Sequence, residues 1–286
     1  MIISIASGKG GTGKTMVATS LAASIKNDYE VQLLDADVEE PNSHIFLKPT
    51  INNIHYVSIM TPLINEERCN HCGKCAEICA FKAVVTIKDT VLTFPELCHG
   101  CGACSYLCPR QAISETPNQI GIIETGAAGN ISFVQGKLDI GQTMPTPVVR
   151  KVKEHIDQKK IAIIDAAPGT SCPVIAAIKD SDFCLLVTEP TPFGLNDLKL
   201  AVETVRQLSV PCGLVLNRSG IGYSNVEEYC HQENIPILLT IPLSLNIARF
   251  YSEGIMLVEG LPEYQEKFKQ AFSRIQEIAS ERNSRT

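Results

Sequence analysis

The chain has 286 residues, of which 44% are hydrophobic and 20% are charged, enough for one large α/β domain or two smaller ones with a buried core. A formal charge of −6 and the absence of Trp offer neither the basic surface nor the aromatic platforms of a nucleic-acid-binding protein. No run approaches the ~20 apolar residues of a membrane span, and no basic leader opens the sequence, so we expect a cytoplasmic protein. The 12 cysteines therefore favour bound metal over disulfides.

The first predicted elements are a strand, a glycine-rich loop and a helix. Residues 2–6 form an apolar run of strand length, and Gly8-x4-Gly13-Lys14-Thr15 follows directly as a complete P-loop. Its backbone amides would cradle phosphate oxygens, Lys14 would neutralise their charge and Thr15 would ligate Mg²⁺. The alternative is a glycine-rich turn that binds no nucleotide. The expected phosphate-binding residues are Gly8, Lys9, Gly10, Gly11, Thr12, Gly13, Lys14 and Thr15.

Eight of the cysteines lie between Cys69 and Cys108, in two copies of one spacing. Each copy reads C-x2-C-x2-C-x3-C, and every cysteine of the first copy recurs at one constant offset in the second, so that Cys69 corresponds to Cys98 and Cys79 to Cys108. Three cysteines of a copy can face one iron–sulfur cluster, while the fourth, on a short helix pointing the other way, completes the cluster of the other copy. One 4Fe-4S cluster is then expected on Cys69, Cys72, Cys75 and Cys108, and the other on Cys98, Cys101, Cys104 and Cys79.

On these residues the segment resembles the bacterial two-cluster ferredoxins. It departs from them at Ala80, where the ferredoxin pattern carries Pro, whereas the second copy keeps Pro109. The alternative is a pair of zinc knuckles, because C-x2-C also suits zinc. We therefore expect a small inserted α+β ferredoxin-like domain at 63–117, within a P-loop ATPase domain formed by 1–62 and 118–286.

The remaining segments alternate between apolar strands and amphipathic helices, which predicts a doubly wound, mostly parallel α/β sheet. Residues 120–140 are expected to continue the sheet with a hairpin. The predicted strands are 30–35, 160–165, 183–188, 212–217 and 237–241, and the predicted helices are 146–158, 194–208, 223–233 and 262–282.

A second lysine, Lys9, directly after the first glycine of the loop matches the deviant Walker A pattern. In this feature the chain resembles the group of MinD, ParA, Mrp and nitrogenase iron proteins. The resemblance implies ATP as the nucleotide and a homodimer closed by ATP, with Lys9 reaching the phosphates of the partner chain. The alternative is a lysine that faces solvent.

Further segments match that group in the same order along the chain. The resemblance implies that Asp37 orients the attacking water, that Asp165 holds Mg²⁺ together with Thr15, and that Gly169 senses the γ-phosphate. Lys9, Lys14, Asp37 and Asp165 are thus the expected catalytic residues. The expected adenine-binding residues are Asn217, Arg218 and Pro242.

Taken together, the motifs predict an ATP-hydrolysing dimer that couples its switching to electron transfer toward an unidentified protein partner. The alternatives are an ATPase that assembles or carries iron–sulfur or metal clusters and a MinD-like spatial switch. Cys172 is expected to be a small buried residue at a helix start, with a bridging ligand or a reactive thiol as alternatives. The tail from residue 263 is expected to pack on the sheet rather than bind a membrane.

Overall fold

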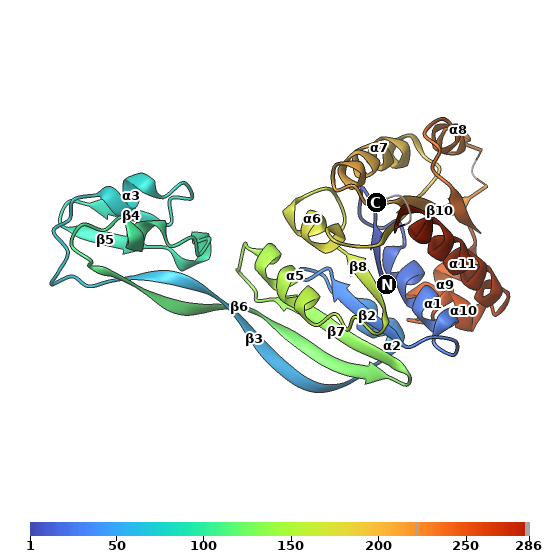
Figure 1. Ribbon diagram of the computed structural model, residues 1–286, viewed down its shortest axis with the longest axis horizontal. Helices are drawn as coiled ribbons and strands as arrows, with labels where there is room; N and C mark the ends of the chain where they lie inside the picture. The colour runs from blue at the N-terminus through green and yellow to red at the C-terminus, as the bar shows by residue number, and fades with distance from the viewer. Residues whose placement is uncertain (221, 284–286) are drawn as a thin grey trace. The chain divides into compact units, whose positions relative to one another are not determined.

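The computed structural model describes residues 1–220 and 222–283, which divide into two compact units (Figure 1). The first unit contains Met1–Ile54, Ile123–Lys137 and the described chain from Val149 onward. The second contains His55–Ile122 and Leu138–Val148, and so is wider than the insert expected at 63–117. The reason is that the flanking strands β3 (Thr50–Ile64) and β6 (Ile113–Ala128) are long and each contain residues of both units.

Within the described residues the larger sheet has nine strands, in the order β11-β10-β9-β1-β8-β2-β7-β6-β3. The run from β11 to β7 is parallel at every pairing, as the alternation of strands and helices predicts. β7 is linked to β6 by a two-residue turn in which Gly129 has a φ of +56°, which makes the predicted hairpin. The further strands of this sheet are β1 (Ile2–Ala6), β2 (Val31–Ala36), β7 (Ile131–Leu138), β8 (Ile161–Ala166), β9 (Phe183–Thr188), β10 (Cys212–Ser219) and β11 (Ile237–Pro242).

Helices cover both faces of the parallel strands (Figure 1). One face packs against α1, α10 and α11 in a single apolar cluster, and the other lies beneath α6 and α7. This coverage explains why the central strands are buried along most of their length. The helices of the first unit are α1 (Lys14–Ile25), α2 (Ser43–Leu47), α5 (Pro145–Glu154, shared with the second unit), α6 (Cys172–Ile178), α7 (Pro192–Gln207), α8 (Asn225–Gln232), α9 (Leu245–Ser252), α10 (Leu257–Gly260) and α11 (Glu263–Asn283).

The tail helix α11 belongs to the core of the first unit. Its apolar face, formed by Phe268, Phe272, Ile275 and Ile278, packs within the same cluster as α1. The prediction that this face packs on the sheet is confirmed. No helix in the described part of the chain is both long enough and apolar enough to cross a membrane.

The second unit contains short elements linked by the cysteine loops. Strands β4 (Val84–Ile87) and β5 (Thr90–Thr93) form an antiparallel pair, and two short helices, α3 (Lys74–Ile78) and α4 (Ala103–Tyr106), contact each other. A single 3₁₀ turn spans Pro95–Leu97. The two helices follow the sequence repeat, since α4 begins at the position of the second copy that corresponds to the start of α3 in the first.

Two expectations from the sequence are wrong in detail. The fourth cysteine of each copy does not lie on the short helix: Cys79 directly follows α3, and Cys108 lies two residues beyond α4. Cys172 does begin a helix, α6, but its side chain is exposed rather than buried, because the first turn of α6 projects at the carboxyl end of the sheet.

Candidate functional site

The P-loop lies between the end of β1 and the start of α1. Its turn depends on glycine, because Gly11 and Gly13 have φ values of +75° and +96°. A Cβ atom on Gly13 would lie 2.5 Å from the Nδ2 atom of Asn217, which itself donates to Thr12 O over 2.7 Å. The end of β10 therefore holds the loop from the side, and the loop places its backbone N–H groups at the N-terminus of α1.

A pocket of about 310 Å³ lies beside this loop. Its volume is in the range of small-molecule and cofactor sites. The expected site residues that line it are Gly10, Gly11, Gly13, Lys14, Thr15, Asp37, Asn217, Arg218 and Pro242. Helix α9 adds Ile247, Ala248 and Tyr251, which the sequence analysis did not single out, although they share one face at helical spacing.

Other expected residues lie behind the pocket wall. Gly8 packs against α7, where an added Cβ atom would lie 2.1 Å from Asp197 O. Gly169, with a φ of +96°, donates its backbone N–H to Ser7 O over 2.9 Å. These contacts fix the P-loop against the segments that follow β8 and β9.

Three carboxylates gather near Lys14 at the carboxyl ends of β2 and β8. Asp35 is fully buried and accepts hydrogen bonds from the backbone of Asp37 and of Ser43. Asp165 Oδ2 accepts from Ser43 Oγ over 3.0 Å, whereas Asp165 Oδ1 is buried without a partner. Asp35 was missed from the sequence, although its position at a strand end was a signal that it faces the site.

Burial and mutual repulsion set the protonation of this group. Burial raises the pKa of Asp35 and of Asp165, and at Asp35 the neighbouring Asp165 charge raises it further. Burial raises the pKa of Asp37 to about 6, although the Lys14 charge opposes the rise. Burial also lowers the pKa of Lys14, whose side chain is 7% exposed. A bound divalent cation would relieve the repulsion among these carboxylates.

Unpaired polar atoms mark where a ligand fits. Within the described residues, Thr12 Oγ1, Asn42 Oδ1 and Asp165 Oδ1 are buried without a hydrogen-bond partner. Such groups cost stability unless a ligand, ion or water satisfies them. Together with the cradle at Gly13, this donor set fits a phosphate group and a hard cation such as Mg²⁺.

Lys9 makes its contact within its own chain. Its Nζ atom donates to Glu189 Oε1, while Arg218 donates to Glu189 Oε2 over 2.8 Å and to Gly11 O over 2.9 Å. Burial would raise the pKa of Glu189, but the hydrogen bond and charge of Lys9 and the charge of Arg218 hold it below its ordinary value. Glu189, one residue past β9, thus holds both cations and is a site residue that the sequence analysis missed.

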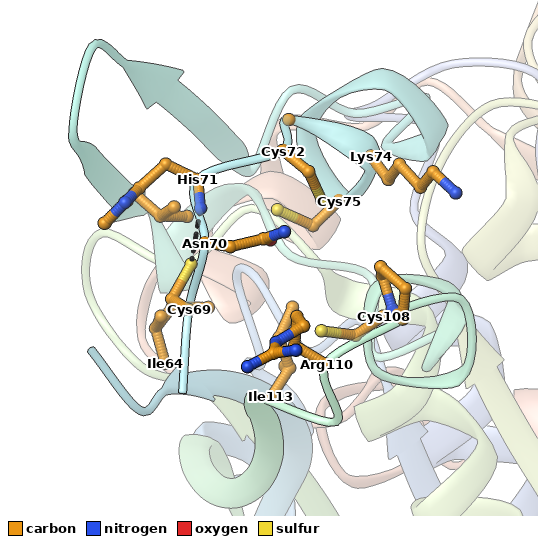
Figure 2. A pocket seen from close by; sticks show the side chains of 13 residues that line it. Ile64, Cys69, Asn70, His71, Cys72, Lys74, Cys75, Cys108, Arg110 and Ile113 are labelled. Atoms are coloured by element: carbon orange, nitrogen blue, oxygen red, sulfur yellow. Dashed lines mark hydrogen bonds between the residues drawn. The ribbon is translucent and has the colours of Figure 1, made fainter. Parts of the chain in front are cut away.

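In the second unit the eight cysteines line two separate cavities. The first cysteine cavity is lined by Cys69, Cys72, Cys75 and Cys108 (Figure 2). The second cysteine cavity is lined by Cys79, Cys98, Cys101 and Cys104. Each cavity therefore collects three cysteines of one repeat and the last cysteine of the other, which is the grouping that the sequence analysis expected.

Backbone N–H groups point at four of these sulfur atoms. The pairs are His71 N to Cys69 Sγ (3.4 Å), Ala112 N to Cys108 Sγ (3.3 Å), Gly100 N to Cys98 Sγ (3.4 Å) and Ala83 N to Cys79 Sγ (3.2 Å). Burial raises the pKa of Cys75, Cys98 and Cys104, so a metal must displace a proton from each of these thiols. Among residues 1–220 and 222–283, no three His, Cys, Asp or Glu side chains are grouped as ligands of a single metal ion.

Of the four remaining cysteines, three lie together in the first unit. Cys184 and Cys212 are register partners on β9 and β10, and burial raises the pKa of Cys184 and of Cys230 to about 12. Such buried thiols behave as small apolar residues.

Comparison with known proteins agrees with the geometry of the first unit. Residues 3–258 match the family model described as "CobQ/CobB/MinD/ParA nucleotide binding domain". Two uncharacterized proteins of Methanocaldococcus jannaschii are similar along most of their length: MJ0578, 30% identical over 97% of both chains, and MJ0579, 32% identical over 89% of this chain and 96% of that one.

Among solved structures, the septum site-determining protein MinD from Pyrococcus horikoshii, complexed with Mg-ADP, superposes with a TM-score of 0.60. It is 19% identical, over 97% of this chain and 96% of that one, and so shares the fold. Since the family model covers most of the chain, including the P-loop and its pocket, the protein belongs to the CobQ/CobB/MinD/ParA nucleotide-binding family.

Proposed function

We propose that this protein is an ATPase in which nucleotide-driven pairing of two chains controls electron transfer, through two iron–sulfur clusters, to a protein partner. The observation that carries the proposal is that one chain combines the P-loop pocket with two cavities that each collect four cysteines. Neither feature alone would connect a nucleotide switch to electron transfer.

The nucleotide part of the proposal rests on the pocket beside the P-loop. The phosphates would lie against the backbone N–H groups of residues 8–15 and the side chain of Lys14. Thr15 and Asp165 would hold Mg²⁺, because Asp165 Oδ1 has no protein partner. Asn217, Arg218 and Pro242 line the same pocket and would receive the base.

Hydrolysis in this proposal needs two chains. Asp37 lines the pocket and would orient the attacking water. Lys9 would leave Glu189 and reach the nucleotide of the partner chain, where its positive charge would act as an arginine finger does. Gly169, fixed to Ser7 at the end of β1, would respond to the γ-phosphate.

The cluster part rests on the chemistry of the cysteine cavities. Four thiols and two backbone N–H donors at each cavity suit a 4Fe-4S cluster. Each thiolate would bind a different iron, so the four sulfur atoms lie farther apart than the ligands of a single metal ion. The second unit would then be a ferredoxin-like insert. A cluster bound there supplies one-electron transfer; the chain's own residues supply the thiolates, the hydrogen bonds and the surrounding charges.

The test is electron paramagnetic resonance of anaerobically prepared, dithionite-reduced protein, with iron and labile sulfide counted. We expect about eight irons per chain. We also expect spectra or midpoint potentials that change when MgATP is added. The change should vanish in Lys14→Met, which loses a phosphate contact, and in Lys9→Ala, which keeps the pocket but loses the proposed contact between chains.

Other outcomes would redirect the proposal. Clusters that leave the protein for an apo-acceptor when MgATP is added would favour the cluster-carrier alternative. Protein that binds MgATP but assembles no iron and sulfide would contradict electron transfer and favour a MinD-like switch, a possibility supported by the shared fold.

A further inference from the structure

The two cysteine cavities form a matched pair. Every cysteine of the first repeat has its counterpart in the second, and the counterparts have the same degree of exposure, with Cys72 and Cys101 exposed and the others half-buried. Each cavity also receives two backbone N–H donors, at 3.4 and 3.3 Å in the first and at 3.4 and 3.2 Å in the second. Hydrogen bonding and solvent exposure, two of the factors that set a cluster potential, are therefore balanced between them.

The charges around the cavities are not balanced. Arg110, two residues after Cys108, lines the first cysteine cavity. Its counterpart in the first repeat is Phe81, two residues after Cys79, which lines the second. Figure 2 shows the Arg110 side chain along the edge of the first cavity near Cys108, while the Lys74 amine extends away from the sulfur atoms. Arg110 forms no ion pair within the described part of the chain, so its charge is available to the cavity.

A carboxylate adds to the contrast at the second cavity. Glu115 lines it, and its Oε1 atom accepts from Ser105 Oγ over 3.2 Å. No acidic side chain in the described residues lines the first cavity. One histidine lines each: His71, which pairs with Glu66 over 3.4 Å, and His99, whose ring stacks on Phe81. Because each cavity has one histidine, the histidines do not cancel the charge difference that Arg110 and Glu115 create between the cavities.

We propose that Arg110 and Glu115 set the order in which the two cysteine cavities take up an electron, so that the first cavity holds it in preference to the second. The inference rests on the proposed function, because both cavities must bind clusters. An added electron makes a cavity more negative by one charge, which a neighbouring cation stabilises and a neighbouring anion opposes. In the half-reduced protein one electron supplied by dithionite resides at the first cavity, and no bond forms or breaks.

The expected effect of each charge on the midpoint potentials is modest, because the side chains of Arg110 and Glu115 are exposed and screened by solvent. We expect each charge to change the equilibrium constant for one-electron exchange between the cavities about tenfold, which corresponds to about 59 mV. Electrons that a low-potential one-electron carrier delivers to the second cavity would then pass to the first and leave from there.

The experiment is a redox titration of the full chain at fixed pH, followed by electron paramagnetic resonance. The unmodified protein should show two midpoints. Arg110→Gln should lower only the higher midpoint, Arg110→Lys should leave it in place because the charge is kept, and Glu115→Gln should raise only the lower midpoint. The repeat offers a reciprocal variant: in the Glu115→Gln background, Arg110→Phe combined with Phe81→Arg should reverse the order.

A measurement without any substitution guards against variants that fail to assemble. Raising the salt concentration should narrow the gap between the two midpoints, because it screens exposed charges. The inference is overturned by coincident midpoints, by a gap that salt leaves unchanged, or by Arg110→Gln lowering the lower midpoint. Iron and sulfide counts separate the two failures: without clusters the proposed function fails as well, whereas about eight irons with unmoved midpoints overturn this inference alone.

Discussion

Ser43 Oγ donates a hydrogen bond to Asp165 Oδ2 over 3.0 Å, and the backbone N–H of Ser43 donates to Asp35 Oδ2 over 2.9 Å. The first residue of α2 therefore connects the carboxylates at the ends of β2 and β8. Ser43 is therefore placed to orient Asp165, the proposed Mg²⁺ ligand, from behind, without itself lining the pocket.

Ser43→Ala should weaken Mg²⁺ binding in the presence of nucleotide by about tenfold. This is the lower end of the loss in metal affinity that usually follows when a residue hydrogen-bonded to a metal ligand is removed. The physical reason is that Asp165 would lose its orienting donor and be left buried with an additional unpaired oxygen. Titration of nucleotide binding against Mg²⁺ measures the effect. Ser43→Thr, which keeps the hydroxyl, is the matched control, and equal Mg²⁺ affinity for Ala and Thr would contradict the assignment.

The sequence predicts the P-loop, the site residues that follow the strands and the two cysteine sets. Each of these depends on a short spacing along the chain, which by itself brings the residues close together in space. It does not reveal Ser43 or Glu189. Glu189 contacts Lys9 across 180 residues of sequence, and Ser43 contacts Asp165 across 122. Such pairs follow from the parallel register of the sheet, which places separate strand ends at one edge but leaves no local pattern around either residue.

The same reasoning explains why Cys172 was misplaced. An apolar thiol at a helix start is most often buried, but burial is decided by what packs over the first turn of α6, and that is tertiary information. The short helices α2, α9 and α10 were also missed, since four to eight residues hold too few turns for a helical period to stand out.

Asp37 should make the nucleotide-free protein less stable as the pH rises from about 4 through about 6. The folded pKa of Asp37, about 6, lies above its ordinary value, so the folded state binds the extra proton and loses stability as that proton leaves. Asp37→Asn should therefore have nearly the Tm of the unmodified protein at pH 4. At pH 7 it should exceed that Tm by an amount on the order of a few °C.

Thermal unfolding of both proteins across this pH range, with a metal chelator present, checks the prediction. Saturating Mg²⁺ and ADP should reduce the difference at pH 7, because a bound cation compensates the Asp37 charge. A difference in Tm that is constant from pH 4 to pH 7 would argue that burial does not raise the pKa of Asp37 in the folded protein.

Glu189→Gln should strengthen ATP-dependent pairing of two chains by several-fold. Glu189 holds Lys9 through a charge-assisted hydrogen bond, and a neutral amide would hold it about half as strongly, which frees Lys9 for the proposed contact with the partner. Analytical ultracentrifugation with MgATP measures the dimer dissociation constant. In a Lys9→Ala background the Glu189→Gln change should have no further effect, and an effect that persists there would place the role of Glu189 with Arg218 instead.

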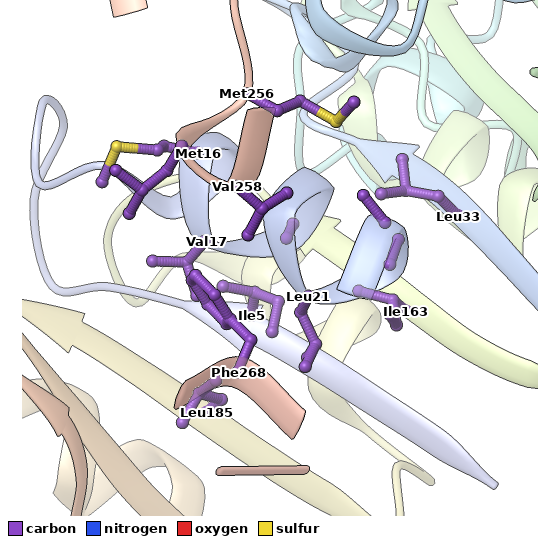
Figure 3. Close-up of a cluster of buried hydrophobic side chains, with 14 of the residues drawn as sticks. Ile5, Met16, Val17, Leu21, Leu33, Ile163, Leu185, Met256, Val258 and Phe268 are labelled. Carbon is purple, nitrogen blue, oxygen red and sulfur yellow. The ribbon is translucent and has the colours of Figure 1, made fainter. Parts of the chain in front are cut away.

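Phe268→Ala should lower the free energy of unfolding by about 3–5 kcal/mol, the usual cost of truncating a buried Phe. Figure 3 shows the Phe268 ring pointing from α11 toward α1, where Val17 and Leu21 lie in the same buried cluster, and the side chain is only 1% exposed. The matched control on α11 is Arg274→Ala, which removes an exposed pair with Glu277 and should cost less than about 0.5 kcal/mol. Denaturant unfolding measures both variants. A cost below about 1 kcal/mol for Phe268→Ala would mean that α11 separates readily from the sheet, and its apolar face would then be available to a membrane after all.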